Sequence, residues 1–151
     1  MDLFFDSSAL VKRYINETGS TWVANTVGLH AGNNIFVADI SAVEITAAIA
    51  RRTRGTSLAA TGATFAGLQN DLRDEYIILQ IDSAVLLDAQ TLARKHFLRG
   101  YDAIQLAVAA RLNQRQLAAG LPTITLVSAD TELLDAARAE GLLVENPNDY
   151  P

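Results

Sequence analysis

The sequence predicts an α/β domain in which helices flank a mainly parallel central sheet, giving three layers. Short apolar runs alternate with longer segments of helical periodicity along the whole chain. Half of the 151 residues are hydrophobic and 19% are charged, which suits one folded core and excludes a mainly disordered chain. Neither a linker nor an internal repeat divides residues 1–151, so we expect a single domain.

Five short apolar runs are predicted to form the strands. Leu3–Phe5 ends at an aspartate, Ile35–Val37 follows a turn-forming Asn-Asn pair, and Thr123–Val127 is rich in β-branched residues. The other two runs are Tyr76–Ile81 and Leu142–Val144. Because helices separate the runs, we expect the strands to pair in parallel through right-handed crossovers.

Seven segments are predicted to be helical from their periodicity and their end signals. Ser41 and Glu44 match a capping box, Asp130 suits an N-cap, and Gly55 and Gly100 are expected to end helices. The helices are expected at Ser7–Ile15, Ser20–Leu29, Ser41–Arg54, Ser57–Glu75, Ser83–Phe97, Tyr101–Ala118 and Asp130–Glu140. The turn-rich tail after the last strand is expected to be a surface extension.

The composition excludes several kinds of site and location. The chain has no cysteine and two histidines, so it has no disulfide, no zinc–thiolate site and no histidine-based metal cluster. No apolar run approaches the roughly 18 residues of a membrane span, and the acidic start is unlike a signal peptide. We therefore expect a soluble, cytoplasmic protein without a membrane partner.

The charge is unevenly distributed along the chain. The net charge is −5, which taken alone argues against a nucleic-acid binder. Residues 40–70 nevertheless hold three arginines and one acid, Glu44, and residues 89–129 hold five basic residues and one acid, Asp102. A lone acid in a basic, apolar segment is unlike an ordinary solvated surface charge.

Four carboxylates lie where ligands bind in folds of this class. Asp6 and Asp130 follow predicted strands, whose carboxyl ends meet at one edge of the sheet. Glu44 and Asp102 lie in the first turns of helices, where partial positive charge accumulates. Carboxylates without histidine or cysteine select hard cations such as Mg²⁺ or Mn²⁺. Such a site can activate water and stabilise charge on a phosphoryl group, while the basic segments hold a polyanion.

Each acid also has a purely structural interpretation. Asp6 and Asp130 could cap the helices that follow them, Glu44 could complete the capping box, and Asp102 could complement a helix dipole. The joint pattern, in which two of the acids stand alone in basic segments, favours a functional site.

Four short motifs occur in a characteristic order. They are Asp6–Lys12, Ser41–Ile45, Gly100–Ala107 and Val127–Leu133. Together they resemble the acidic motifs of PIN-domain proteins, especially the VapC-like toxins, and the third is the most specific. The resemblance runs from residue 4 to about residue 146, nearly the whole chain.

This resemblance implies a metal-dependent ribonuclease with a PIN-like fold. It implies an acidic site that binds Mg²⁺ or Mn²⁺ and is formed by Asp6, Glu44, Asp102 and Asp130. It also suggests Ser8 and Ser128 as supporting hydroxyls near the metal. Members of the family are silenced by a cognate antitoxin and commonly form homodimers, so both partners are expected here.

The expected reaction is hydrolysis of a single-stranded RNA phosphodiester by direct attack of water. Asp6, Asp102 and Asp130 would chiefly hold the metal, and Glu44 would bind it or help to deprotonate the water. The candidate RNA contacts are Arg99, Arg51 and Arg52, although each could be an ordinary solvated charge. The alternative is a PIN-like protein that binds RNA or a partner and cleaves poorly.

Other functions and other polar residues are assigned less weight. A receiver-like domain would need a lysine after the last strand, and an aspartyl phosphatase would need an acid two residues after Asp6. A dinucleotide-binding module would need a glycine-rich turn after the first strand, and this sequence has none of the three features at these positions. Asp39 and Asp82 are expected to be helix caps, and His96 to lie at a helix end. Trp22 and Tyr14 are expected in the core or in an interface.

Overall fold

The computed structural model describes residues 1–150, apart from the side chains of Leu29 and Leu58. One sheet contains five parallel strands in the order β3-β2-β1-β4-β5. The strands are β1 (Asp2–Phe5), β2 (Asn34–Ala38), β3 (Ile77–Leu79), β4 (Thr125–Val127) and β5 (Leu143–Glu145). The predicted parallel α/β class is therefore confirmed, and β1 lies at the centre of the sheet.

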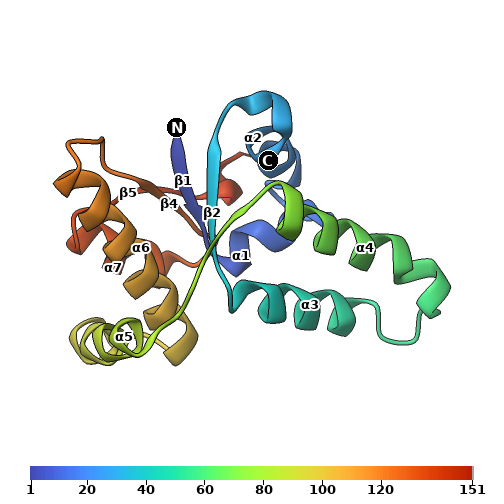
Figure 1. Cartoon of the computed structure of the whole chain (residues 1–151). Helices are drawn as coiled ribbons and strands as arrows, with labels where there is room; N and C mark the ends of the chain where they lie inside the picture. The colour runs from blue at the N-terminus through green and yellow to red at the C-terminus, as the bar shows by residue number, and fades with distance from the viewer. Residues whose placement is uncertain (151) are drawn as a thin grey trace.

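Helices cover both faces of this sheet, as Figure 1 shows. The α-helices are α1 (Ser7–Leu10), α2 (Ser20–Val27), α3 (Ser41–Arg52), α4 (Leu58–Asp74), α5 (Ser83–His96), α6 (Gly100–Ala118) and α7 (Thr131–Ala139). Three short 3₁₀ segments accompany them: η1 (Val11–Arg13), η2 (Leu29–Ala31) and η3 (Pro147–Asp149). Helices α5, α6 and α7 gather on one side of the sheet, and α1 to α4 lie on the other.

Two hydrophobic cores separate the three layers. Successive side chains of a strand point to opposite faces, and β1 follows this rule. Phe4 packs with Leu126 into the core beneath α5, α6 and α7. Leu3 and Phe5 pack into the other core, together with Val37. Because both faces of β1 are buried, the strand is apolar throughout rather than alternating.

The boundary between α5 and α6 differs from the prediction. Helix α5 ends at His96, and Phe97 takes the left-handed conformation with φ 57°. Gly100 does not end a helix, because it is the first residue of α6. Leu98 is buried in the core while the Phe97 side chain is 90% exposed, so Leu98 holds the connection between the two helices on the fold. Phe97 thus occupies the C-terminal position that glycine usually takes.

The predicted capping box at the start of α3 is wrong. The N-cap residue is Ile40, which offers no side-chain hydrogen bond, and Ser41 is the first residue inside the helix. Ser41 is completely buried, and its Oγ accepts a hydrogen bond from Gln105 Nε2 at 2.9 Å. Asp39 is not a cap either, because its Oδ2 accepts from the backbone N–H of Ile81 at 3.4 Å.

The C-terminal tail packs against α2 instead of extending from the surface. Pro147 is buried, and the backbone of Gly19, at the start of α2, approaches it closely. The ring of Tyr150 stacks on Trp22, with centroids 4.9 Å apart and planes 8° from parallel. The predicted surface extension is therefore wrong, because these contacts hold the tail on the fold.

Helix α4 is held to the body of the molecule by a polar network. Arg13 Nε donates to Asp71 Oδ2 at 2.7 Å, and its Nη2 donates to Glu75 at 3.0 Å. The Tyr14 hydroxyl also donates to Asp71, at 2.8 Å, and lies 3.0 Å from the hydroxyl of Tyr76. This network fixes α4 relative to η1, and Figure 1 shows α3 and α4 on the same side of the sheet.

Candidate active site

Asp6 is a buried carboxylate at the carboxyl end of the central strand. It directly follows β1, and its backbone N–H donates to the carbonyl of Val127 at 3.0 Å. Its side chain is 2% exposed and caps α1 by accepting from the N–H groups of Ser8 and Ala9. Burial raises the pKa of Asp6 to about 6, although these hydrogen bonds and those of two serine hydroxyls oppose the rise. The predicted role of Asp6 as a helix cap is confirmed, but capping alone does not explain why the carboxylate is buried.

Two serine hydroxyls converge on Asp6. Ser128 Oγ donates to Asp6 Oδ2 at 2.7 Å, and Ser8 Oγ donates to the same oxygen at 3.1 Å. The two hydroxyl oxygens lie 3.3 Å apart. Ser8 and Ser128 therefore lie where supporting hydroxyls are expected, and together they fix the orientation of the Asp6 carboxylate.

Asp130 is connected to the same cluster through the backbone. Strand β4 pairs with β1, so the loop after β4 lies next to Asp6. The backbone N–H of Asp130 donates to Ser128 Oγ at 3.0 Å, and that of Ala129 donates to Ser8 Oγ at 2.9 Å. The Asp130 carboxylate caps α7 through the N–H groups of Glu132 and Leu133. Asp130 thus acts as the predicted cap while lying at the edge where Asp6 lies.

Asp102 lies in the first turn of α6 among other acids. Burial raises its pKa, and the charges of Asp130, Glu44 and Glu132 raise it further. Arg99, the N-cap residue of α6, opposes this rise.

Glu44 is held by a neutral partner. It lies in the first turn of α3, and its Oε2 accepts from Gln105 Nε2 at 2.8 Å. Gln105 belongs to α6, one turn after Asp102. The structure thus brings the loop that carries Asp130 to Asp6, and it brings Glu44 to the helix that carries Asp102. The charge of Asp130 also raises the pKa of Asp102.

The donors suit a hard divalent cation, although they do not form a closed cluster. Within residues 1–150, no three histidine, aspartate or glutamate side chains are arranged so that they could hold a metal ion as they stand. The chemistry nevertheless fits Mg²⁺ or Mn²⁺, because the four acids supply carboxylate oxygens alone. Burial is the main cause of the raised pKa of Asp102, and neighbouring acids, whose charge a cation would neutralise, add to the rise.

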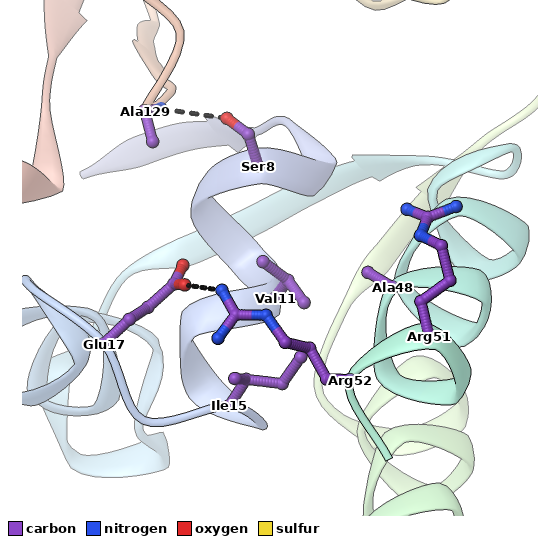
Figure 2. Close-up of a pocket in the computed structure, with 8 residues that line it drawn as sticks. All are labelled: Ser8, Val11, Ile15, Glu17, Ala48, Arg51, Arg52 and Ala129. Carbon is purple, nitrogen blue, oxygen red and sulfur yellow. Dashed lines mark hydrogen bonds and ion pairs between the residues drawn. The ribbon is translucent and has the colours of Figure 1, made fainter. Parts of the chain in front are cut away.

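A cavity of about 430 Å³ adjoins the serine cluster. Ser8 and Ala129 line one part of it, and Arg51 and Arg52 of α3 line another (Figure 2). Arg52 Nη2 pairs with Glu17 at 2.9 Å, an interaction that Figure 2 draws across the cavity. Arg51 makes no ion pair with any described residue and is exposed. The two predicted arginines therefore differ, since Arg51 is free to meet an anion and Arg52 is not.

Three residues near the site were missed by the sequence analysis. Gln105 holds Glu44, Glu132 adds to the negative charge around Asp102, and Glu17 pairs with both Lys12 and Arg52. Gln105 had a usable signal, because it lies three residues after Asp102 and so shares its helix face. Glu17 had none, since its partners depend on how η1 and α3 pack.

Comparison with known proteins decides the family. A family model of the PIN domain matches residues 3–139. This chain belongs to the PIN-domain family. The recognition of the family from the four acidic motifs is therefore confirmed.

Two bacterial PIN relatives match over most of their length. They are ribonuclease VapC45 of Mycobacterium tuberculosis strain CDC 1551 / Oshkosh and ribonuclease VapC49 of strain ATCC 25618 / H37Rv. Each is 32% identical over 146 residues, which cover 94% of this chain and 93% of the relative.

Solved structures share the fold at lower sequence identity. PAE2754 from Pyrobaculum aerophilum gives a TM-score of 0.62 at 16% identity, covering 99% of this chain and 91% of its own. FitAcB from Neisseria gonorrhoeae gives 0.57 at 16% identity, with coverage of 96% and 97%. At this identity the two structures support the PIN fold alone.

Proposed function

We propose that this PIN-domain chain is a divalent-metal-dependent endoribonuclease that cleaves single-stranded RNA and serves as the toxin of a toxin–antitoxin pair. The observation that carries the proposal is the buried Asp6 carboxylate, which two serine hydroxyls orient at the carboxyl edge of the sheet next to the loop that carries Asp130. The names of the two relatives as ribonucleases and VapC proteins support the same reaction class. Repelling carboxylates cost stability, so their clustering suits a cation-binding role.

In this proposal the four acids hold Mg²⁺ or Mn²⁺ between them. The residues are Asp6, Asp102, Asp130 and Glu44, with Ser8 and Ser128 orienting the Asp6 carboxylate. A bound ion would supply charge stabilisation at the phosphoryl group and lower the pKa of a bound water. The chain offers neither a cysteine nor a histidine at this site, so direct attack by water fits its residues.

The proposed RNA path runs from the acids toward the basic residues beside them. Arg99 lies close enough to Asp102 to oppose the rise of its pKa, and Arg51 lines the cavity that begins at Ser8. A cation next to an acidic metal site can hold the phosphates on either side of the scissile bond. Arg52 would contribute only if RNA displaced Glu17 from it.

The proposed partners are an RNA substrate, a cognate antitoxin and a second copy of the chain. The VapC names of the relatives support the antitoxin. No helix within residues 1–150 is long and apolar enough to cross a membrane.

A cleavage assay on a single-stranded RNA oligonucleotide tests the reaction. We expect EDTA to abolish cleavage and Mg²⁺ or Mn²⁺ to restore it, while a fully paired duplex of the same sequence is cleaved slowly. Asp102→Asn should lower the rate by orders of magnitude, whereas Asp135→Asn, which changes an exposed acid on α7, should not. Full activity in EDTA would contradict the metal mechanism. RNA binding without cleavage in either metal would favour the alternative, a PIN-like binding protein.

A further inference from the structure

Gln105 is a polar side chain enclosed within the fold. It is 1% exposed and follows Asp102 by three residues on α6, so the two side chains share one helix face. Its neighbours on the helix are Ile104 and Leu106, which contribute to the hydrophobic core. A buried amide costs free energy unless it is hydrogen-bonded, so its partners explain what the residue does.

Both N–H groups of the Gln105 amide are directed at α3. Nε2 donates to Ser41 Oγ at 2.9 Å and to Glu44 Oε2 at 2.8 Å. Ser41 and Glu44 are themselves three residues apart on α3, so one amide spans one turn of the facing helix. Because a carboxylate can only accept, the amide nitrogen faces Glu44 and the amide oxygen faces away from it.

A neutral donor suits this position better than a cation would. A lysine or arginine would pair with Glu44 and cancel its charge, whereas a glutamine orients the carboxylate and leaves it negative. Within residues 1–150 its Oε1 has no hydrogen-bond partner, so the amide is anchored through Nε2 alone, to Ser41 and Glu44. Gln105 therefore donates a hydrogen bond to the Glu44 carboxylate, while its own amide oxygen accepts none within residues 1–150.

We propose that Gln105 is a positioning residue that fixes the orientation of the Glu44 carboxylate and thereby sets the geometry of the acidic site. This inference rests on the proposed function, in which Glu44 belongs to the metal-binding set. One helix thus supplies one acid of the site, Asp102, and the amide that orients another.

The chain provides a matched control in Gln116. This residue lies on the same helix and is also buried, and its Oε1 likewise has no partner within residues 1–150. Its Nε2 also donates to a carboxylate, Asp2 Oδ2, at 2.6 Å. Asp2 begins β1, at the opposite end of the strand from Asp6. Gln105→Leu and Gln116→Leu therefore remove the same group from the same kind of partner, near the site and far from it.

We expect Gln105→Leu to lower kcat roughly 10- to 100-fold, the effect of one hydrogen bond to a charged group, with little change in KM for RNA. Gln116→Leu should lose thermal stability but keep kcat. In a Glu44→Gln background, Gln105→Leu should produce no further loss of kcat, because its partner is already changed. Equal losses in the two backgrounds would overturn the role through Glu44.

Titration with Mn²⁺ by calorimetry provides a measurement that does not depend on cleavage. Gln105→Leu should weaken Mn²⁺ binding relative to both the wild type and Gln116→Leu. Should Gln105→Leu fail to fold, Gln105→Met replaces it in every measurement. If the wild type cleaves RNA and the Gln105 variant has the same kcat and the same affinity for Mn²⁺, this inference alone is overturned. A wild type that neither cleaves RNA nor binds Mn²⁺ overturns the proposed function as well.

Discussion

Asp6 shows how one residue can serve the fold and the proposed chemistry at once. Its carboxylate caps α1, yet it is almost completely enclosed and its pKa is raised to about 6. A raised pKa in the folded state means that the folded protein binds the proton more tightly than the unfolded chain does. The stabilising contribution is therefore present below the unfolded value of 3.8 and is lost as the pH rises through about 6.

Asp6→Asn should therefore stabilise the metal-free protein at pH 7. The ionised carboxylate lowers the free energy of unfolding by roughly 3 kcal/mol at that pH, and the amide removes this cost. Urea unfolding in EDTA between pH 4 and pH 8 measures the effect. The wild type should lose stability as the pH rises through 6, and the variant should lose less. A variant that is less stable than the wild type at pH 7 would contradict the assignment.

Phe97 has a backbone conformation that is unfavourable for a residue with a side chain. Within residues 1–150 it is the one non-glycine residue with positive φ, and its ring is exposed to solvent. Left-handed backbone costs a non-glycine residue about 1–2 kcal/mol. Phe97→Gly should therefore raise the melting temperature, by up to about 4 °C for a gain of 1 kcal/mol. Tyr101→Gly, which removes another exposed aromatic but inside α6, should lower it.

At the scale of elements, the predictions succeeded where a local signal decides the outcome. Asp82 and Asp130 cap α5 and α7 as their sequence positions indicate, because a cap needs only the next turn. Helix α3 begins at Ser41 as predicted, but the capping box was wrong because Ser41 bonds to Gln105, a residue 64 positions away that no local pattern reveals. The four acids were placed on the right elements, but the hydroxyl cluster around Asp6 and the amide on Glu44 depend on tertiary packing.

The start of α2 also depends on a contact with a residue far away in the sequence, Pro147. Gly19 has φ +85°, and a Cβ on it would come within 2.3 Å of the Pro147 carbonyl oxygen. Gly55 has the same φ but no atom within 4 Å of such a Cβ. Gly55→Ala should thus cost about 1–2 kcal/mol from backbone strain alone, and Gly19→Ala roughly 1–3 kcal/mol more from overpacking. Equal losses in thermal unfolding would show that the tail does not press on α2.

At the scale of the whole molecule, basic residues lie near the proposed site although the net charge is negative. The chain carries −5 overall, yet Arg99 lies close enough to Asp102 to lower its pKa, and Arg51 lines the cavity next to Ser8. Ion pairs occupy several other basic residues, including Lys95 with Glu140 and Arg111 with Asp88. At least two cations are thus available near the proposed site, which a net charge cannot reveal.

Arg99→Ala should weaken RNA binding about equally for all sequences. One phosphate contact on a single strand contributes a slope of about −0.7 to a plot of log affinity against log salt concentration, so the slope should flatten by that amount. Affinity is measured across a salt series in an Asp6→Asn background with Ca²⁺, which prevents cleavage. Arg73→Ala is the control, because Arg73 is exposed on α4 and pairs with Asp74. An unchanged slope would remove Arg99 from the RNA path and leave Arg51 as the next candidate.

The central position of β1 has a consequence for synthesis on the ribosome. Strand β1 cannot gain its second neighbour until residues 125–127 of β4 have been synthesised, long after β1 itself. Asp6, Glu44 and Asp102 are therefore made before the Ser128 hydroxyl and Asp130 that complete this edge. A nascent polypeptide that has not reached residue 130 lacks the assembled site, so we expect it to be harmless to the message that encodes it.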